Sequence, residues 1–116
     1  MRDDPTVVDL VIAARKGDRD AWNRIVARYA PLIWTICRRF QLSRSDVDDV
    51  GQTVWLTLVE HLDTIREPAA LPGWLATTTR NECLKVVRAG QRRQHGEQAL
   101  DAEPAVRDDL AELELE

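Results

Sequence analysis

Residues 73–93 read GWLATTTRNECLKVVRAGQRR, and this stretch decides the fold class because it has the periodicity of one long amphipathic helix. At 100° per residue, one side of the wheel carries mainly apolar residues: Leu75, Ala76, Thr79, Cys83, Val86 and Val87. Pro72 fits the first turn of such a helix. We predict a helix that runs to about Arg93, follows a proline-containing loop and packs through Leu75, Thr79, Cys83 and Val86.

Two helices are predicted near the start of the chain. Thr6 is a suitable N-cap for a short first helix, and Gly17 supplies its C-terminal stop. Asp18 or Asp20 begins a longer segment, whose apolar residues recur at steps of three and four. Pro31 lies inside that segment, so we expect it either to kink the helix or to split it in two.

A third helix start is indicated by Ser43 and Ser45, which precede three aspartates that favour the positive end of a helix dipole. The inward side of this helix would be formed by Val47, Val50, Val54, Leu58 and Leu62. No alternation typical of strands is detectable. We therefore predict an all-α fold, a compact bundle of four to five helices.

Length and composition fit one globular domain. The chain has 116 residues, of which 31% are charged and 44% hydrophobic. We assign the helical domain to residues 1–95 and an acidic linker or tail to residues 96–116. No apolar stretch approaches the roughly 18 residues of a membrane helix, and the N-terminus lacks the features of a secretory signal. A cytoplasmic location is expected, with no membrane partner.

Sequence motifs for catalysis or metal binding are missing. Cys37 and Cys83 match no metal-binding spacing, and they are expected to be buried apolar residues. His61 and His95 are each alone in the sequence, and no phosphate loop or nucleophile motif occurs. We expect neither an enzyme nor a bound cofactor or metal.

The charges are strongly segregated along the chain. Residues 1–95 have 15 basic and 12 acidic side chains, whereas residues 96–116 have one base and eight acids. Within the domain, residues 41–65 have one base and five acids, and residues 66–95 have six bases and two acids. One face should therefore attract phosphate, and another should attract a basic partner.

The predicted fourth helix has a polar side opposite its apolar one. That side carries Trp74, Thr77, Thr78, Asn81, Lys85, Arg88 and Arg92, and its cations have no acid four residues away. A solvated charged face is one interpretation. An aromatic residue among unneutralised cations is also the combination that binds single-stranded nucleic acid.

Three collinear stretches carry a family resemblance. They are DLVIAARKGD at 9–18 with AW at 21–22 and YAPL at 29–32, DVDDVGQ at 46–52 with VWL at 54–56, and GWL at 73–75 with RN at 80–81 and residues 88–93. Together they resemble region 2 of bacterial sigma factors of the extracytoplasmic-function (ECF) class, over residues 6–93. The fold implied is that of sigma region 2.

The resemblance implies that the third helix binds the coiled coil of the β′ subunit of core RNA polymerase. It assigns this contact to Asp46, Asp48, Asp49, Gln52 and Trp55. Helix capping is the alternative role for Asp46 and Asp48. Gly51 and Thr53 depart from the family, which usually has a bulky apolar residue and an acid at these positions.

The fourth helix resembles the one that reads the non-template strand of the promoter minus 10 element. The DNA-binding residues expected are Arg66, Trp74, Thr77, Thr78, Arg80, Asn81, Lys85, Arg88, Arg92 and Arg93. The cations would neutralise phosphates, Asn81 would read a base edge, and Trp74 would wedge at the upstream edge of the bubble. The alternatives are a plain exposed position for Asn81 and a core position for Trp74.

The function expected is that of a transcription initiation factor domain that binds core RNA polymerase and recognises and melts the minus 10 element. An anti-sigma factor is a further candidate partner. The alternatives are an interaction adaptor or a DNA-binding regulator of another family. The sequence contains no match to region 4, so we do not expect it to recognise a minus 35 element. Three tryptophans are assigned to the core: Trp22, Trp34 and Trp55.

Overall fold

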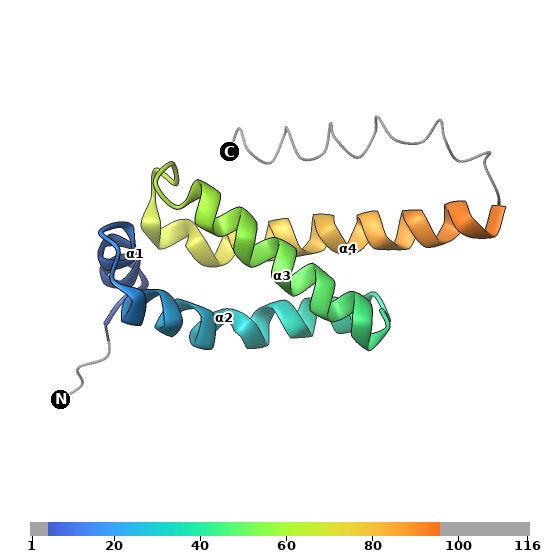
Figure 1. The fold of residues 1–116 in the computed structure, drawn as a ribbon, viewed down its shortest axis with the longest axis horizontal. Helices are drawn as coiled ribbons and strands as arrows, with labels where there is room; N and C mark the ends of the chain where they lie inside the picture. The colour runs from blue at the N-terminus through green and yellow to red at the C-terminus, as the bar shows by residue number, and fades with distance from the viewer. Residues whose placement is uncertain (1–4, 96–116) are drawn as a thin grey trace.

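The computed structural model describes residues 5–95, and over this range the chain is all-α, as predicted. The helices are α1 (Val7–Arg15), α2 (Arg19–Arg39), α3 (Arg44–His61) and α4 (Leu71–His95), with a short 3₁₀ turn, η1 (Pro68–Ala70), before α4. In Figure 1, α2 and α3 lie against the first half of α4, and α4 extends beyond both of them. The expected acidic tail, residues 96–116, lies outside the described residues.

Local capping explains where the first two helices begin. Thr6 and Asp9 form a capping box, in which Thr6 Oγ1 accepts from the Asp9 amide at 3.0 Å and Asp9 Oδ2 accepts from the Thr6 amide at 3.2 Å. After α1, Gly17 has φ +96°, a conformation that favours glycine. Asp18 is the N-cap of α2, and its Oδ1 accepts from the Ala21 amide. The predicted caps are confirmed.

Helix α2 is continuous through Pro31, so of the two expected effects, a kink or a split, the split is excluded. An internal proline removes one helix hydrogen bond and costs about 3 kcal/mol or more. Side chains on both sides of it are buried on one face of the helix, namely Ile25, Ile33 and Cys37. Burial of both halves against the same core offsets the lost hydrogen bond and keeps them in one helix.

The core forms where α4 contacts both α2 and α3. On α4, Leu71, Leu75, Thr79 and Cys83 are fully buried, and Val86 packs against the core. Ser43 caps α3 through a bond from the Asp46 amide to Ser43 Oγ at 3.1 Å. The predicted inward side of α3 is confirmed, because Val50, Val54, Leu58 and Leu62 are buried and Val47 is partly buried.

The three tryptophans assigned to the core differ in their surroundings. Trp22 and Trp55 pack against the core while partly exposed, with ring centroids 6.0 Å apart in an edge-on arrangement. Trp34 is 53% exposed, so its assignment to the core is wrong. Trp34 follows the buried Ile33 by one residue, a rotation of about 100° around the helix. This rotation carries it out of the inward side of α2.

Cys37 of α2 and Cys83 of α4 are free and fully buried, as predicted, with their Sγ atoms 3.7 Å apart. Burial raises the pKa of Cys37 above the ordinary thiol value of 9.0. Burial, the contact with Cys37 and the charge of Glu82 raise the pKa of Cys83 to about 12. The folded protein therefore keeps both thiols protonated under ordinary conditions.

These thiols should make the protein less stable at alkaline pH. Between pH 9.0 and about 12 the unfolded chain loses the Cys83 proton while the folded chain retains it. The free energy of unfolding should consequently fall as pH rises through this range. Urea denaturation at pH 8 and pH 10 measures the fall. The fall in the free energy of unfolding should be smaller in Cys83→Ala. An equal fall in that variant would show that the Cys83 thiol is not its cause.

Candidate functional site

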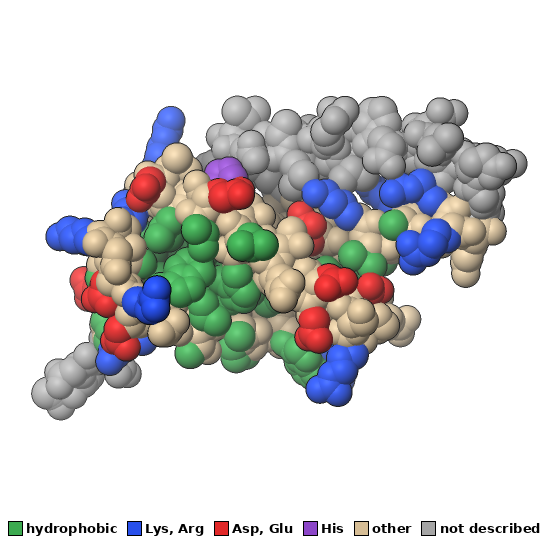
Figure 2. Space-filling model, in the orientation of Figure 1, with side chains coloured by type: hydrophobic (Ala, Val, Ile, Leu, Met, Phe, Trp, Pro, Cys, Tyr) green, Lys and Arg blue, Asp and Glu red, His purple; other side chains and the backbone are tan. Residues whose placement is uncertain are grey.

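The first candidate surface is the acidic N-terminal half of α3. Ser43 supplies the N-cap of α3, and Asp46 lies in the first turn, where a carboxylate favours the positive end of the helix dipole. Asp48, Asp49 and Gln52 are exposed, and Asp46 is partly buried in the first turn. Within the described part of the chain, no ion pair involves any of these carboxylates. Figure 2 shows acidic side chains near this end of α3.

A groove of about 250 Å³ lies between α2 and α3, next to the acidic half of α3. Three of the predicted polymerase-binding residues line it: Asp48, Gln52 and Trp55. The α2 side consists of Ala30, Ile33 and Trp34, and the α3 side also includes Val47 and Gly51. Asp46 and Asp49 do not line the groove.

Sequence reasoning missed the exposed apolar residues of the adjoining surface. On α3, Leu56 is 64% exposed and Val59 57% exposed, and they follow Gln52 by four and seven residues. That spacing puts all three on one side of the helix. Ile12 of α1 is also exposed. Figure 2 shows a broad hydrophobic area on this face of the molecule. The only sequence signal was that Leu56 and Val59 fall outside the predicted inward side.

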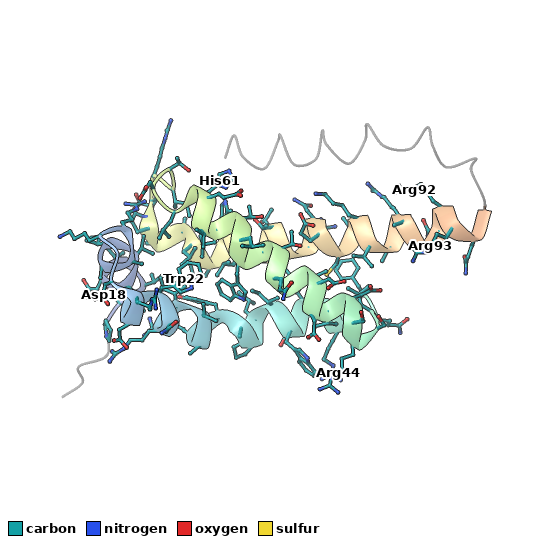
Figure 3. The ribbon with its side chains drawn as sticks, viewed as in Figure 1. Asp18, Trp22, Arg44, His61, Arg92 and Arg93 are labelled. Carbon is teal, nitrogen blue, oxygen red and sulfur yellow. The ribbon has the colours of Figure 1, made fainter. Side chains whose placement is uncertain are left out.

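The second candidate surface is the basic side of α4. Figure 2 shows Lys and Arg side chains along the C-terminal half of this helix, and Figure 3 labels Arg92 and Arg93 near its end. Arg80 and Arg93 are exposed, whereas Thr77, Thr78, Arg88 and Arg92 are partly buried. Lys85 pairs with Glu82 at 3.1 Å, an acid three residues away that the sequence analysis did not consider.

Asn81 does not have the exposed position expected for it. Its side chain is only 4% exposed, and its Nδ2 has no hydrogen-bond partner within residues 5–95. A helical wheel orders the side chains around one helix, but it does not say how far other segments cover them. The prediction of exposure failed for this reason, while the inward positions of Leu75, Thr79 and Cys83 on the same wheel are confirmed.

Trp74 has a position between the two that were expected. It is partly buried against the core, and its ring centroid lies 6.2 Å from that of His61 at the end of α3. His61 Nδ1 donates to the carbonyl of Thr57 at 2.9 Å, which fixes the imidazole ring. Figure 3 shows His61 near the loop that leads into α4. No sequence pattern connects His61 with Trp74, which lies 13 residues further along the chain.

Arg15 of α1 holds the loop before α4. Its Nε donates to the carbonyl of Leu62 at 2.8 Å, and its Nη2 donates to the carbonyl of Ile65. Arg66, one of the predicted DNA-binding residues, follows directly and is exposed. The sequence analysis missed this contact because nearly fifty residues separate the partners along the chain.

The described residues provide no group of three or more His, Cys, Asp or Glu side chains able to hold a metal ion. Across residues 5–95 there is also no helix with the length and apolarity needed to cross a membrane.

Comparison with known proteins identifies the family. Residues 25–93, which include most of α2, all of α3 and nearly all of α4, match the family described as Sigma-70 region 2. The chain belongs to this family. It is also 30% identical over 96 residues to the ECF RNA polymerase sigma-E factor of Haemophilus influenzae. These findings confirm the resemblance to region 2 of an ECF sigma factor.

The match to the relative covers 81% of this chain and 50% of the relative, so the chain spans about half the length of that protein. Both candidate surfaces of this sigma region 2 fall within the matched residues 25–93. Family membership removes the alternative of a DNA-binding regulator from another family.

The Arg15 contact can be tested in this sigma region 2 by substitution. Arg15→Ala should lower the free energy of unfolding by about 1–3 kcal/mol, because two loop carbonyls lose a charged donor. Urea denaturation measures this loss, and amide hydrogen exchange should become faster in residues 62–67. Lys16→Ala, at the exposed neighbouring position, is the matched control. Equal stability of the two variants would show that Arg15 does not hold the loop.

Proposed function

We propose that this sigma region 2 binds core RNA polymerase through α2 and α3 and uses α4 to recognise and melt the promoter minus 10 element. It acts as a transcription initiation factor and not as an enzyme. Its place of action would be the cytoplasm, with the polymerase. An anti-sigma factor that covered either surface would inhibit it.

The observation that carries this proposal is the separation of two chemically different surfaces on neighbouring helices. The α3 surface has exposed carboxylates without an ion-pair partner in the described residues, next to exposed apolar side chains. The α4 surface is basic and begins beside an aromatic pair, Trp74 and His61. A protein that joins a second protein to nucleic acid needs two such surfaces.

Polymerase contact would combine charge with apolar burial. Asp48 and Asp49 are suited to meet basic groups, a type of contact that mainly sets the register and the rate of association. Leu56 and Val59 are suited to supply affinity, because apolar surface removed from water contributes roughly 25 cal/mol per Å². Asp46, Gln52 and Trp55 complete the proposed contact.

DNA contact would divide between phosphate binding and base reading. Lys85, Arg88, Arg92 and Arg93, together with Arg66 and Arg80, would bind phosphates, which gives affinity without sequence information. Thr77 and Thr78 flank this face. Trp74 presents its exposed part as a stacking surface at the start of α4.

Asn81 is the residue proposed to read a base, although its side chain is buried. A buried amide without a hydrogen-bond partner costs about 1–3 kcal/mol. A base edge that reached the amide would supply the missing partner. Reading by Asn81 therefore requires that DNA binding uncover it.

The polymerase contact predicts the effect of a double substitution. Asp49→Arg with Gln52→Ala should abolish binding to core polymerase in a pull-down, because the new arginine would repel the basic groups that Asp49 attracts. Both side chains are exposed, so thermal unfolding should remain nearly unchanged. Asp63→Arg, an exposed charge reversal beyond the end of α3, is the control. Normal binding by the folded double variant would remove these residues from the interface.

The proposed DNA contact predicts that affinity from phosphate binding and specificity from base reading can be separated by substitution. Arg88→Ala should weaken binding to all single strands alike and reduce the salt slope by about 0.7. Asn81→Ala should narrow the difference between a minus 10 strand and a scrambled strand by about 1–3 kcal/mol. Fluorescence anisotropy at low salt with short non-template oligonucleotides measures both effects.

Arg19→Ala on the exposed start of α2 is the control for the loss of one positive charge. If Asn81→Ala weakened binding to the minus 10 strand and the scrambled strand equally, Asn81 would contact the DNA backbone and not a base. If the protein bound core polymerase but no DNA, it would be an interaction adaptor. If it bound DNA without any effect of either substitution, the DNA site would lie elsewhere.

A further inference from the structure

Gly51 leaves an open space in the middle of α3. A Cβ atom added at this position would meet nothing within 4 Å. Neither a close neighbour nor a left-handed backbone requires glycine here, since Gly17 is the only described glycine with positive φ. Glycine within a helix costs about 1 kcal/mol relative to alanine. The residue thus weakens the helix without any benefit inside the domain.

The open space belongs to the groove between α2 and α3. Six of the eight residues that line this groove are apolar: Ala30, Ile33, Trp34, Val47, Gly51 and Trp55. Ala30 and Gly51, the two smallest lining residues, come from different helices, and both tryptophans of the lining, Trp34 and Trp55, are large. The polar lining residues are Asp48 and Gln52. Such a site is hollow, mainly apolar and acidic on one side.

Trp34 lines the same groove and is exposed, so a partner could contact it. Its side chain is 53% exposed, although burial of an indole is strongly favourable. The guanidinium of Arg38 lies 4.8 Å from the centre of the ring, and this cation–π contact restrains it. A restrained, exposed aromatic ring loses little entropy when a partner binds, which favours its use as a contact residue.

We propose that a helix of core RNA polymerase inserts one large apolar side chain, of the size of leucine, methionine or phenylalanine, into the groove between α2 and α3 that Trp34 and Trp55 line. Gly51 then determines which partner side chain fits. This inference rests on the proposed function and adds to it the chemistry of one contact. The inserted side chain acts as a knob in a hole formed by two helices, the usual packing of helix on helix.

The charge of Asp48 indicates what should lie next to the inserted side chain. Asp48 belongs both to the groove and to the acidic surface proposed for polymerase binding. The described residues give it no ion-pair partner. The inserted apolar side chain should therefore have a basic neighbour on its own helix. A partner that entered the groove would contact Gln52 as well, since that residue lines it.

The test fills the groove with a larger side chain at position 51. In the full chain, Gly51→Leu should weaken binding to core polymerase about tenfold, which corresponds to about 1.4 kcal/mol. Gly51→Ala, the matched control, adds only a methyl group and should bind nearly as wild type does. Both substitutions replace glycine by a better helix former, so thermal unfolding should occur at the same or a higher temperature. Anisotropy of an N-terminally labelled chain, titrated with core polymerase, gives the affinities.

The wall of the groove is tested in the same assay. Trp34→Phe should bind core polymerase within a small factor of wild type, because an aromatic ring remains. Trp34→Ala should bind several-fold more weakly. Trp34 is more than half exposed, so neither change removes a core side chain. Equal affinities of the two variants would remove Trp34 from the contact.

Each outcome bears on a different statement. Normal binding by Gly51→Leu, with wild type also bound, would overturn the groove contact and leave the proposed function standing. Equal loss in Gly51→Ala and Gly51→Leu would contradict a contact that depends on the volume of the side chain. Failure of the wild type to bind core polymerase would overturn the proposed function itself. A wild-type dimer that Gly51→Leu dissociates, with unchanged polymerase affinity, would assign the groove to a second copy of the chain.

Discussion

The packing of α4 against α2 and α3 is the contact on which the rest of the structure depends. Leu75, Thr79 and Cys83 are fully buried in it, and Cys83 meets Cys37 of α2 at 3.7 Å. Helices of this length are marginal alone in water and gain most of their stability from such packing. The same contact orients α4. Because one side of the helix is buried in the core, only the opposite side remains for other partners. The positions of the basic side chains are thus consequences of the core.

The sequence predicted well those features that depend on neighbouring residues along the chain. Caps such as Thr6, Asp18 and Ser43 act within one turn, and apolar spacing sets the inward side of each helix, so both could be derived without coordinates. Features that depend on contacts between distant segments could not. The bonds of Arg15 to the loop before α4 and the burial of Asn81 are of this second kind. Periodicity alone did not predict an unbroken α2, since the burial that offsets Pro31 lies between helices.

Charge has different roles on the two proposed surfaces. On α4, Glu82 pairs with Lys85 and so removes part of the positive charge that the sequence pattern indicated. The pair is only partly buried, and ion pairs that solvent reaches contribute little to stability, typically up to 1 kcal/mol. On α3, the carboxylates of Asp48 and Asp49 have no cation partner among residues 5–95. Folding of the described domain gains nothing from pairing them, and a basic partner would not have to displace an internal ion pair.

Features that weaken the domain gather on the surface formed by α2 and α3. Gly51 lowers the helix propensity of α3, and Trp34 and Leu56 leave apolar surface in water. Residues that break the rules of folding are expected where a protein meets its partners. On α4 the comparable exception is Asn81, whose buried amide nitrogen has no hydrogen-bond partner in the described residues and which belongs to the helix proposed to bind DNA. Gly51, Trp34 and Leu56 are an argument for an interface on this surface that does not depend on any family resemblance, and they belong to the helices proposed to bind polymerase.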